Sequence, residues 1–345
     1  MSLSLWERVR EAAGCPLSVI FVLTNRCNLR CPHCYCPKPE TDELSTGEVS
    51  QLLQQMKDAG VFRVTFTGGE PLLREDLLEL VAEAHRLRFI IHLKTNGTRI
   101  VDGMAARLRD LGLTSMDVSL YSVNKDAHDR FVGAEGSFDA AVNAADAFWA
   151  AGGDVQVNMT IMNWNAREVP LMLDLCAAHG WKGGIDGRMT ATQQGDAAPL
   201  QYQASLDTLA PAIEAQLHRG ILSLDGMASC IRSGEEQVCS AGIEAVVILP
   251  DGEVWPCLTL PWSMGNVRHT PFRNIVVNSP VVERIRNIRW ADSPACVTCD
   301  VAGLCNRCPA EAFRAHGDEK GFTPTDCLLA EARARAMGLP RDRGR

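Results

Sequence analysis

Three closely spaced cysteines near the amino terminus constrain this chain more than any other feature. Cys27, Cys31 and Cys34 form a CxxxCxxC array directly after the apolar, β-branched run Val19–Thr24. Three thiolates can bind one inorganic core, but a fully protein-ligated [4Fe–4S] cluster takes four. The array therefore predicts a cluster with one iron open to another ligand. A structural zinc site is the alternative, although such sites usually take four tetrahedral ligands in CxxC pairs.

The remaining cysteines form a second group. The chain has fourteen cysteines, four of them between Cys27 and Cys36 and eight between Cys230 and Cys327. In a reducing cytosol such a set binds metals more often than it forms disulfides. The clustering predicts two metal-binding regions. Cys15, Cys36 and Cys176 have no evident partner and are interpreted as structural or unassigned.

Composition predicts an ordinary globular protein. Apolar residues make up 46% of the chain and charged residues 22%, and the net charge is −8. An acidic balance disfavours nucleic acid and anionic membranes, because phosphate contacts need a basic face. No apolar run reaches the roughly 18 residues that span a bilayer, and the start lacks a signal-peptide pattern. We therefore expect a cytoplasmic protein without nucleic-acid or membrane partners.

Strand and helix patterns alternate along residues 17–199. The expected strands are Val19–Thr24, Arg63–Thr67, Phe89–Thr95, Ser115–Leu120, Val155–Met162 and Gly184–Thr190. The expected helices are Thr46–Ala59, Glu75–Leu87, Met104–Leu111, Phe138–Ala151, Arg167–His179 and Leu200–Leu217. A capping box at Ser45 and Glu48 predicts where the first helix begins, and Gly60 predicts where it ends. Such alternation predicts an α/β fold with a parallel sheet, whose chemistry lies at the carboxyl ends of the strands.

Five segments are expected along the chain. A short amino-terminal segment, 1–16, precedes the barrel-like region, 17–199. A linker helix region, 200–229, leads into a cysteine-rich domain, 230–330, in which helical periodicity fades and Cys, Gly and Pro take over. The last segment, 331–345, is basic and is expected to be a frayed tail.

The cysteine array, with His33 as the ring before its third cysteine, resembles the signature of the radical S-adenosylmethionine (SAM) superfamily. The resemblance implies a partial (β/α)6 barrel. It also implies that SAM chelates the open iron. An electron from the cluster then cleaves SAM into methionine and a 5′-deoxyadenosyl radical, which abstracts hydrogen from a substrate.

The resemblance extends to residues that would contact SAM. The second strand runs into Gly68-Gly69-Glu70, which looks like the family's GGE motif for the SAM ammonium. The other implied contacts are polar residues at or near the ends of later strands: Asn96, Ser119 and Asn158. Asn163, Arg188 and Gly195 are weaker candidates. For all of them an ordinary turn or a solvated loop is the alternative. Where many relatives carry an Arg before a glycine, this chain has Val132 and its nearest Arg is Arg130, so the resemblance does not carry a carboxylate-pairing Arg over to this position.

The second cysteine group resembles the SPASM domain, which holds two auxiliary [4Fe–4S] clusters. The resemblance rests on the C…GxxxxC spacing of Cys239, Gly252 and Cys257, followed by two CxxC pairs and a last cysteine. It implies a first auxiliary cluster on Cys230, Cys239, Cys257 and Cys308, and a second on Cys296, Cys299, Cys305 and Cys327. With the SAM cluster this makes three [4Fe–4S] clusters. The Cys305–Cys308 gap is one residue shorter than the usual CxxxC, and two structural zinc sites remain the alternative.

The resemblance implies a function in peptide modification. SPASM enzymes mostly modify ribosomally made peptides, so a precursor peptide is the expected substrate and an oxidative crosslink or related modification the expected product. Relatives that make formylglycine carry an acidic residue where this chain has Leu258, which disfavours that reaction. A separate leader-recognition protein and a flavodoxin- or ferredoxin-type reductant are the expected partners. A radical SAM oxidase or decarboxylase of a small molecule or tetrapyrrole is an alternative, and a non-enzymatic iron–sulfur electron carrier is another.

No residue is a clear catalytic acid, base or hydrogen donor. Tyr121, Asp251 and Glu253 are conceivable, but an ordinary polar side chain at the surface is the better interpretation of each. Cys36 is a conceivable hydrogen donor if the reaction is an epimerisation.

Overall fold

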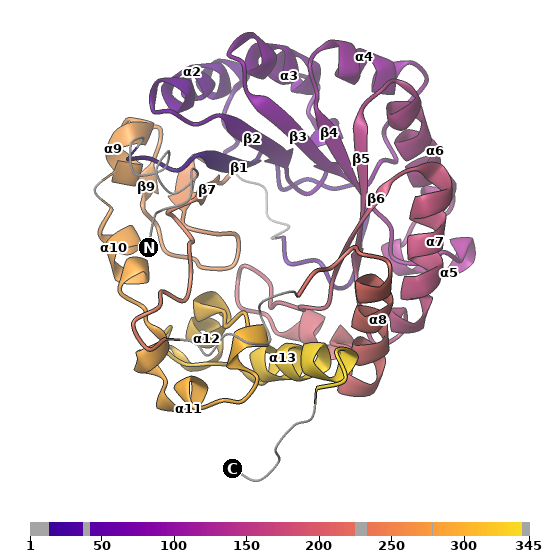
Figure 1. Ribbon diagram of the computed structural model, residues 1–345. Helices are drawn as coiled ribbons and strands as arrows, with labels where there is room; N and C mark the ends of the chain where they lie inside the picture. Colours follow the sequence, from indigo (N-terminus) through magenta and orange to yellow (C-terminus); the bar gives the residue numbers. More distant parts are fainter. Residues whose placement is uncertain (1–13, 37–41, 225–232, 278, 340–345) are drawn as a thin grey trace.

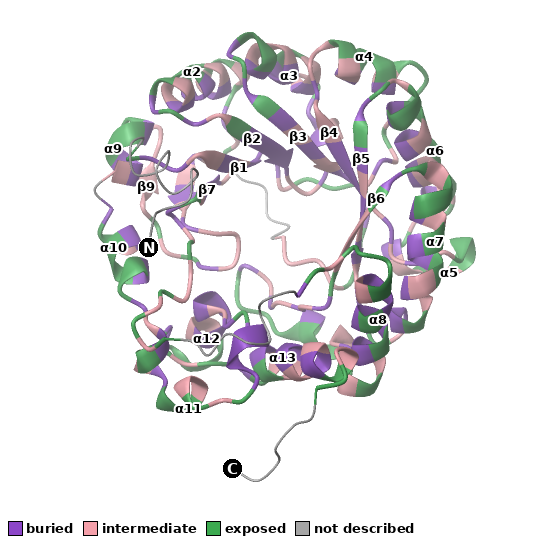
Figure 2. Ribbon diagram, viewed as in Figure 1, coloured by how far each residue is buried: buried purple, intermediate pink, exposed green. Residues whose placement is uncertain are grey.

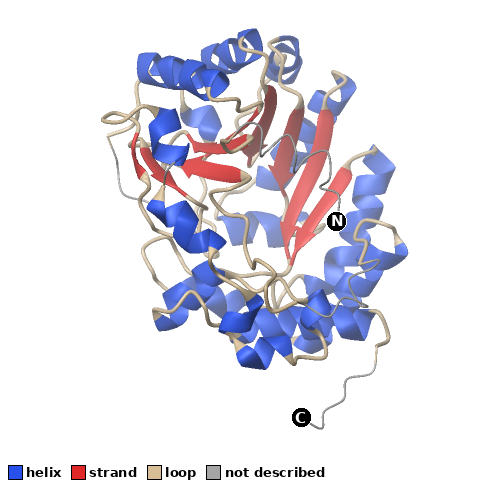
Figure 3. Cartoon of the chain, turned by 60° about the vertical axis from the view of Figure 1, so that its left-hand side comes forward, coloured by secondary structure: helices blue, strands red, loops and turns tan. Residues whose placement is uncertain are grey.

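A computed structural model describes residues 14–36, 42–224, 233–277 and 279–339, and the fold is described for these residues (Figure 1). Six parallel strands form a curved sheet with its helices on the outer side, as Figures 1 and 3 show. Their bounds are β1 Ser18–Val22, β2 Arg63–Thr67, β3 Ile90–Thr95, β4 Ser115–Ser119, β5 Asp154–Thr160 and β6 Lys182–Asp186. The helices of this half are α2 Thr46–Asp58, α3 Leu77–Arg86, α4 Met104–Asp110, α5 Lys125–Val132, α6 Ser137–Ala150, α7 Val169–His179 and α8 Leu206–His218. The predicted partial (β/α)6 barrel is confirmed.

Side-chain alternation fixes which face of each strand is covered. In β3, Ile91, Leu93 and Thr95 are buried, while His92 and Lys94 point to the opposite face and are partly exposed. Successive side chains of a strand point to opposite faces, so the apolar set packs under the helices and the polar set faces the hollow of the barrel. Figure 2 shows the resulting buried sheet. Each fully buried Phe or Leu contributes about 1.5–3 kcal/mol.

The first barrel helix begins where the capping box predicts. Ser45 is the N-cap of α2, and its side chain accepts a hydrogen bond from the backbone N–H of Glu48. The Glu48 carboxylate accepts in return from the Ser45 backbone N–H at 2.8 Å. Gly60, at φ 95°, lies directly after the last turn. The helix therefore ends in a left-handed conformation that favours glycine.

The cysteine-rich half continues the barrel sheet. Strand β7 (Ala245–Ile248) pairs in parallel with β1, and β8 (Glu253–Trp255) and β9 (Gly265–Asn266) follow antiparallel, giving the order β6-β5-β4-β3-β2-β1-β7-β8-β9. Its helices are α9 Phe272–Val277, α10 Pro280–Arg286, α11 Pro294–Val297, α12 Pro309–His316 and α13 Pro324–Ala336. In Figure 1, α12 and α13 lie opposite β1–β6, across the open side of the barrel.

Four local expectations differ from the structure. The segment between β4 and α6 contains helix α5, because the Asn124 side chain caps it and Gly133 ends it. The expected helix Leu200–Leu217 is interrupted, since Ala198–Tyr202 is a 3-10 turn and α8 begins after Ser205. Helices are present after residue 230, four of them with Pro in the first turn, a position where its missing N–H costs nothing. Helix α13 runs through Ala336, so the first residues of the expected tail are helical.

No helix among the described residues is both long enough and apolar enough to span a membrane.

Candidate active site

The Gly68–Gly69 turn holds the cysteine loop against the end of β2. The backbone N–H of Gly69 donates to the Thr24 carbonyl oxygen at 2.8 Å, and that of Glu70 donates to the Arg26 carbonyl oxygen at 2.8 Å. A Cβ on Gly68 would lie 2.4 Å from the Thr24 oxygen, and one on Gly69 would lie 2.4 Å from the Arg26 oxygen. Only glycine allows this approach, so the two glycines position the loop that carries the three cysteines.

Glu70 lies behind this turn as a fully buried carboxylate. Its oxygens accept hydrogen bonds from the Leu72 backbone N–H at 3.0 Å, the Thr95 hydroxyl at 2.8 Å and the Asn96 backbone N–H at 2.8 Å. Burial raises the pKa of Glu70, and these hydrogen bonds oppose that rise. The carboxylate therefore ties the end of β3 to the end of β2. The Glu70 side chain does not line the cavity beside the three array cysteines.

Asn96 connects the end of β3 to the cysteine loop. Its side-chain amide donates to the Asn28 side-chain oxygen at 3.1 Å and lies 4.0 Å from the Cys27 sulfur. Asn28 in turn donates to the Thr98 hydroxyl at 2.8 Å. The Asn-Gly turn that follows β3 thus lies against the cysteine loop.

Polar side chains of three neighbouring strands meet on the hollow face of the barrel. The Lys94 ammonium contacts the Asp117 carboxylate at 2.5 Å, and the Asn158 amide donates to the same carboxylate at 3.2 Å. Gln156 donates to the Asn158 side-chain oxygen at 2.8 Å. Ser119 lies two residues beyond Asp117 on the same face. Asp117 is therefore satisfied by neighbouring side chains and holds Lys94 and Asn158 in place.

One cavity brings these elements together. It is lined by the three array cysteines and by five of the six expected SAM-contact residues, with neighbours from the same strands and loop: Cys27, Leu29, Cys31, His33, Cys34, Tyr35, Cys36, Thr67, Gly68, Gly69, Lys94, Thr95, Asn96, Ser119, Tyr121, His128, Val132 and Asn158. The loop after β1 and residues of β2, β3, β4 and β5 thus share one pocket at the carboxyl edge of the sheet, where the parallel-barrel rule places chemistry.

Aromatic side chains pack behind the cysteine loop. The His33 ring lies 4.6 Å from the Tyr121 ring and 5.1 Å from the Phe131 ring, centroid to centroid. Burial lowers the pKa of His33 and of His128 to about 4, so both imidazoles are neutral at pH 7. This packing fixes the loop without adding positive charge beside the thiolates.

Two further groups of cysteines form in the second half. Cys296, Cys299, Cys305 and Cys327 line a single pocket together with Trp290 and Phe322. This is the set assigned to the second auxiliary cluster.

Cys239, Cys257 and Cys308 pack together around Leu260 and Ile285. They belong to the set assigned to the first auxiliary cluster. Its fourth member, Cys230, lies outside the described residues.

The donor chemistry fits iron–sulfur clusters. No disulfide joins any of the thirteen described cysteines. Within the described ranges, no three His, Cys, Asp or Glu side chains gather closely enough to hold one metal ion. A [4Fe–4S] core is larger than one ion and keeps its thiolates further apart. The wider spacing of the cysteines is therefore compatible with such a cluster. The shortened Cys305–Cys308 gap still places its two cysteines in different groups, as the assignment requires.

Other candidate residues lie elsewhere. Glu253 accepts hydrogen bonds from Ser263 and Asn266 within the β8–β9 region. Neither Asp251 nor Glu253 lines the cavity that contains the three array cysteines, which we call the SAM-side cavity. The Arg188 side chain contacts Asp326 and Asn306 in the second half of the chain.

The three unassigned cysteines have different environments. Cys36 lines the SAM-side cavity, and a hydrogen bond with Cys34, together with burial, raises the pKa of its thiol. Cys176 is buried in helix α7, where burial raises its pKa to about 11.

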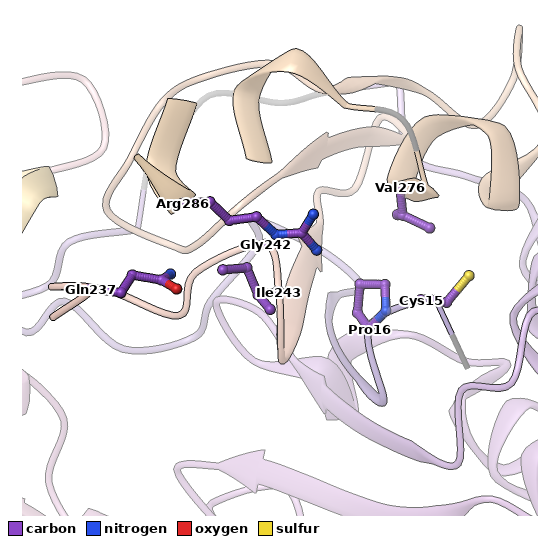
Figure 4. A pocket seen from close by; sticks show the side chains of 8 residues that line it. Cys15, Pro16, Gln237, Gly242, Ile243, Val276 and Arg286 are labelled. Carbon is purple, nitrogen blue, oxygen red and sulfur yellow. The ribbon is translucent and has the colours of Figure 1, made fainter. Parts of the chain in front are cut away.

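Cys15 lies at a separate cavity of about 330 Å³, which is formed where the chain enters β1 and β7 (Figure 4). The Arg286 side chain extends across this cavity toward Pro16. The cavity is at the edge of the sheet opposite the three-cysteine loop.

Sequence reasoning missed two side chains of the site. Lys94 lies two residues from both His92 and Asn96. Because residues two apart on a strand point to the same face, the pattern of β3 would have placed Lys94 on the hollow face of the barrel. His128 lines the cavity from helix α5, and its ring accepts a hydrogen bond at 3.2 Å from the backbone N–H of Tyr121, which lies just beyond β4. Without helix α5, no signal in the sequence placed this imidazole near the cysteines.

Comparison with known proteins matches both halves of the chain. The family model described as the radical SAM superfamily matches residues 21–176, and the SPASM model, described as an iron–sulfur cluster-binding domain, matches residues 239–309. The AdoMet-dependent heme synthase of Methanosarcina barkeri is 26% identical over 329 residues, which cover 88% of this chain and 94% of that protein. The PqqA peptide cyclase of Gluconobacter oxydans is 28% identical over 298 residues, which cover 83% of each.

Solved structures share the fold. Streptococcus suis SuiB bound to the precursor peptide SuiA has a TM-score of 0.74 at 16% identity, covering 94% of this chain and 82% of that chain. SuiB bound to S-adenosylmethionine has a TM-score of 0.71 at 16% identity, covering 91% and 77%. The two domain matches imply iron–sulfur clusters and SAM as cofactors. The chain is therefore an enzyme that contains a radical SAM domain and a carboxyl-terminal SPASM domain.

Proposed function

We propose that this enzyme oxidatively modifies a ribosomally made precursor peptide after reductive cleavage of SAM. One observation carries the proposal: the three array cysteines, the Gly-Gly turn and polar residues of three further strands line one cavity. When bound there, the cluster and SAM supply a 5′-deoxyadenosyl radical that abstracts hydrogen from the substrate. The similarity to PqqA peptide cyclase supports a peptide as that substrate.

The residues of the cavity have separate roles in this proposal. Cys27, Cys31 and Cys34 hold the SAM cluster, and Gly68 and Gly69 present backbone groups to the SAM methionyl end. Glu70 acts from behind this surface, because its oxygens hold the Asn96 backbone and thereby position the Asn96 amide beside Cys27.

Ser119 and Asn158 offer polar contacts deeper in the barrel. Lys94, which is paired with Asp117, offers a positive charge to the carboxylate of a ligand bound in the same cavity. The neutral His33 packs against the rings of Tyr121 and Phe131 beside the same loop.

The SPASM half holds two auxiliary [4Fe–4S] clusters in this proposal, which makes three clusters in all. Cys230, Cys239, Cys257 and Cys308 bind the first, and Cys296, Cys299, Cys305 and Cys327 bind the second. Bound to these cysteines, the clusters would supply an acceptor or a relay for the electron that leaves the substrate during oxidation. A flavodoxin- or ferredoxin-type protein supplies the electron for SAM cleavage, a separate protein recognises the leader peptide, and the enzyme works in the cytoplasm.

The test is the mass of the product. The reconstituted enzyme is supplied anaerobically with reductant, SAM and the short peptide encoded nearest its gene, in deuterated water. Loss of two hydrogens from the peptide supports oxidative crosslinking or desaturation. A gain of one deuterium alone indicates epimerisation, and Cys36 then becomes the donor to replace. An unchanged peptide, with SAM still cleaved, contradicts a peptide substrate.

The second candidate is oxidation or decarboxylation of a tetrapyrrole. It is favoured by the similarity to the heme synthase of Methanosarcina barkeri, which spans 94% of that protein. The same assay with an iron coproporphyrin in place of the peptide separates the two candidates. Loss of carboxyl groups from the porphyrin would assign the enzyme to this class.

A further inference from the structure

Arg188 lies at the junction between the barrel and both cysteine groups of the SPASM half. It follows strand β6, and its guanidinium donates to the Asp326 carboxylate at 2.7 Å and to the Asn306 carbonyl oxygen at 2.9 Å. Asn306 lies between Cys305 and Cys308, which belong to different groups. One barrel side chain therefore contacts the segment that joins the two groups.

Asp326 is the buried partner of this arginine. Its carboxylate is 1% exposed. The oxygen that pairs with Arg188 also accepts from the Cys308 backbone N–H at 3.1 Å. The other oxygen accepts from the backbone N–H and the hydroxyl of Thr323, at 2.8 and 2.9 Å. Because Asp326 directly precedes Cys327, this carboxylate is fixed between the first and second groups.

Both charges lie beside cysteines of the two groups. The Cys305 sulfur lies 3.9 Å from the Asp326 carbonyl oxygen, and the Cys308 backbone N–H donates to the Asp326 carboxylate. The Arg188 guanidinium contacts that carboxylate and the carbonyl oxygen of Asn306, the residue after Cys305. In a low-dielectric interior such charges are weakly screened.

We propose that the Arg188–Asp326 pair sets the reduction potentials of both auxiliary clusters, with Arg188 raising them and Asp326 lowering them. The inference rests on the proposed assignment of the two cysteine groups to clusters. Each one-electron reduction adds one negative charge to a cluster, so a neighbouring cation favours the reduced state and a neighbouring anion disfavours it. Cluster potentials respond to net charge, hydrogen bonds and exposure. The pair is a positioning and tuning element that touches no substrate.

The test is a redox titration of the iron-loaded holoenzyme, followed by electron paramagnetic resonance. Arg188→Met should move the midpoints of both auxiliary clusters to more negative potentials, and Arg188→Lys should restore them toward the wild-type values. Arg335→Met is the matched control, because Arg335 is an exposed residue of helix α13 that pairs with Asp207. It should leave both midpoints unchanged. Full iron content in Arg188→Met with unchanged midpoints, or with a shift in one cluster only, overturns the inference.

Asp326→Asn supplies an independent sign test. Removing the anion should move both midpoints to more positive potentials, and unchanged or more negative midpoints overturn the inference. This variant decides the matter if Arg188→Met fails to retain iron. Failure of the proposed cluster assignment would look different. In that case the wild-type chain itself would bind only the SAM cluster and would show no auxiliary midpoints.

Discussion

At the scale of single residues, two glycines and one carboxylate decide where the cysteine loop lies. Gly68 and Gly69 allow the backbone of β2 to approach Thr24 and Arg26, and Glu70 then ties the end of β3 to the same point. The sequence identified all three residues as a motif. It could not identify Glu70 as a buried acceptor of three hydrogen bonds, because those donors come partly from residues 25 positions away.

Gly69→Ala should destabilise the protein and release the SAM cluster. The added Cβ would meet the backbone of Arg26 at 2.4 Å, where no flexible side chain can move aside. Overpacking of this kind costs about 1–3 kcal/mol. Anaerobic urea unfolding and iron content measure the two effects.

Gly47→Ala is the matched control for this substitution. A Cβ there has no neighbour within 4 Å. In helix α2 the substitution should stabilise the chain by about 0.5–1 kcal/mol. A Gly69→Ala protein as stable and as rich in iron as wild type would show that the close approach is unnecessary.

Glu70→Gln should weaken SAM binding and stability together. The glutamine amide has only one acceptor oxygen, so at least one of the three donors that now meet the carboxylate loses its partner. An unsatisfied buried group costs about 1–3 kcal/mol. Calorimetry of SAM binding and urea unfolding measure the losses. Weaker binding without any loss of stability would instead assign Glu70 a direct contact with SAM.

At the scale of elements, Arg268 links the start of helix α2 and the residues before it to the SPASM half. The Arg268 guanidinium contacts Glu48 at 2.7 Å and Asp42 at 2.8 Å, and donates to the Glu43 carbonyl oxygen at 3.2 Å. The capping box of α2 was predictable from Ser45 and Glu48 alone. The contact with Arg268, 220 residues further along the chain, was not, because local patterns carry no information on such pairing.

Removing Arg268 should reduce the change in the free energy of unfolding between pH 6 and pH 3. A hydrogen bond from Arg268 is the largest cause that lowers the pKa of Glu48, to about 2. A carboxylate whose folded pKa is depressed stabilises the fold above its unfolded pKa, about 4.3. That contribution is lost as pH falls toward 2. Arg268→Met should therefore be less stable than wild type at pH 6, with the gap narrowing at pH 3.

Urea unfolding at the two pH values measures the gap, which solvent screening keeps small because the Glu48 side chain is 39% exposed. Lys182→Met is the control, since its ion pair with Asp154 is longer, at 3.9 Å, and exposed. A gap of equal size at pH 6 and pH 3 would contradict the role given to Glu48.

At the scale of the whole molecule, the alternation of strands and helices predicted the barrel, and the two cysteine spacings predicted the two regions. The pairing of β7 with β1 was not predicted. A four-residue strand is too short to show a periodic pattern, and no local pattern indicates which strand it pairs with. Helix α5 was also missed, since its apolar face is short and its cap at Asn124 lies in a polar run. The polar residues of β3, β4 and β5 could be foreseen individually. Their meeting at one cavity follows only from the parallel order of the strands.

The most direct test of this account is SAM cleavage by the reconstituted enzyme. Anaerobic protein with dithionite and SAM should release 5′-deoxyadenosine, measured by liquid chromatography and mass spectrometry. A Cys27→Ala/Cys31→Ala/Cys34→Ala variant should retain the auxiliary iron and release none. A wild-type protein that contains zinc in place of iron, or that carries its full iron content and still leaves SAM intact, would contradict the central claim.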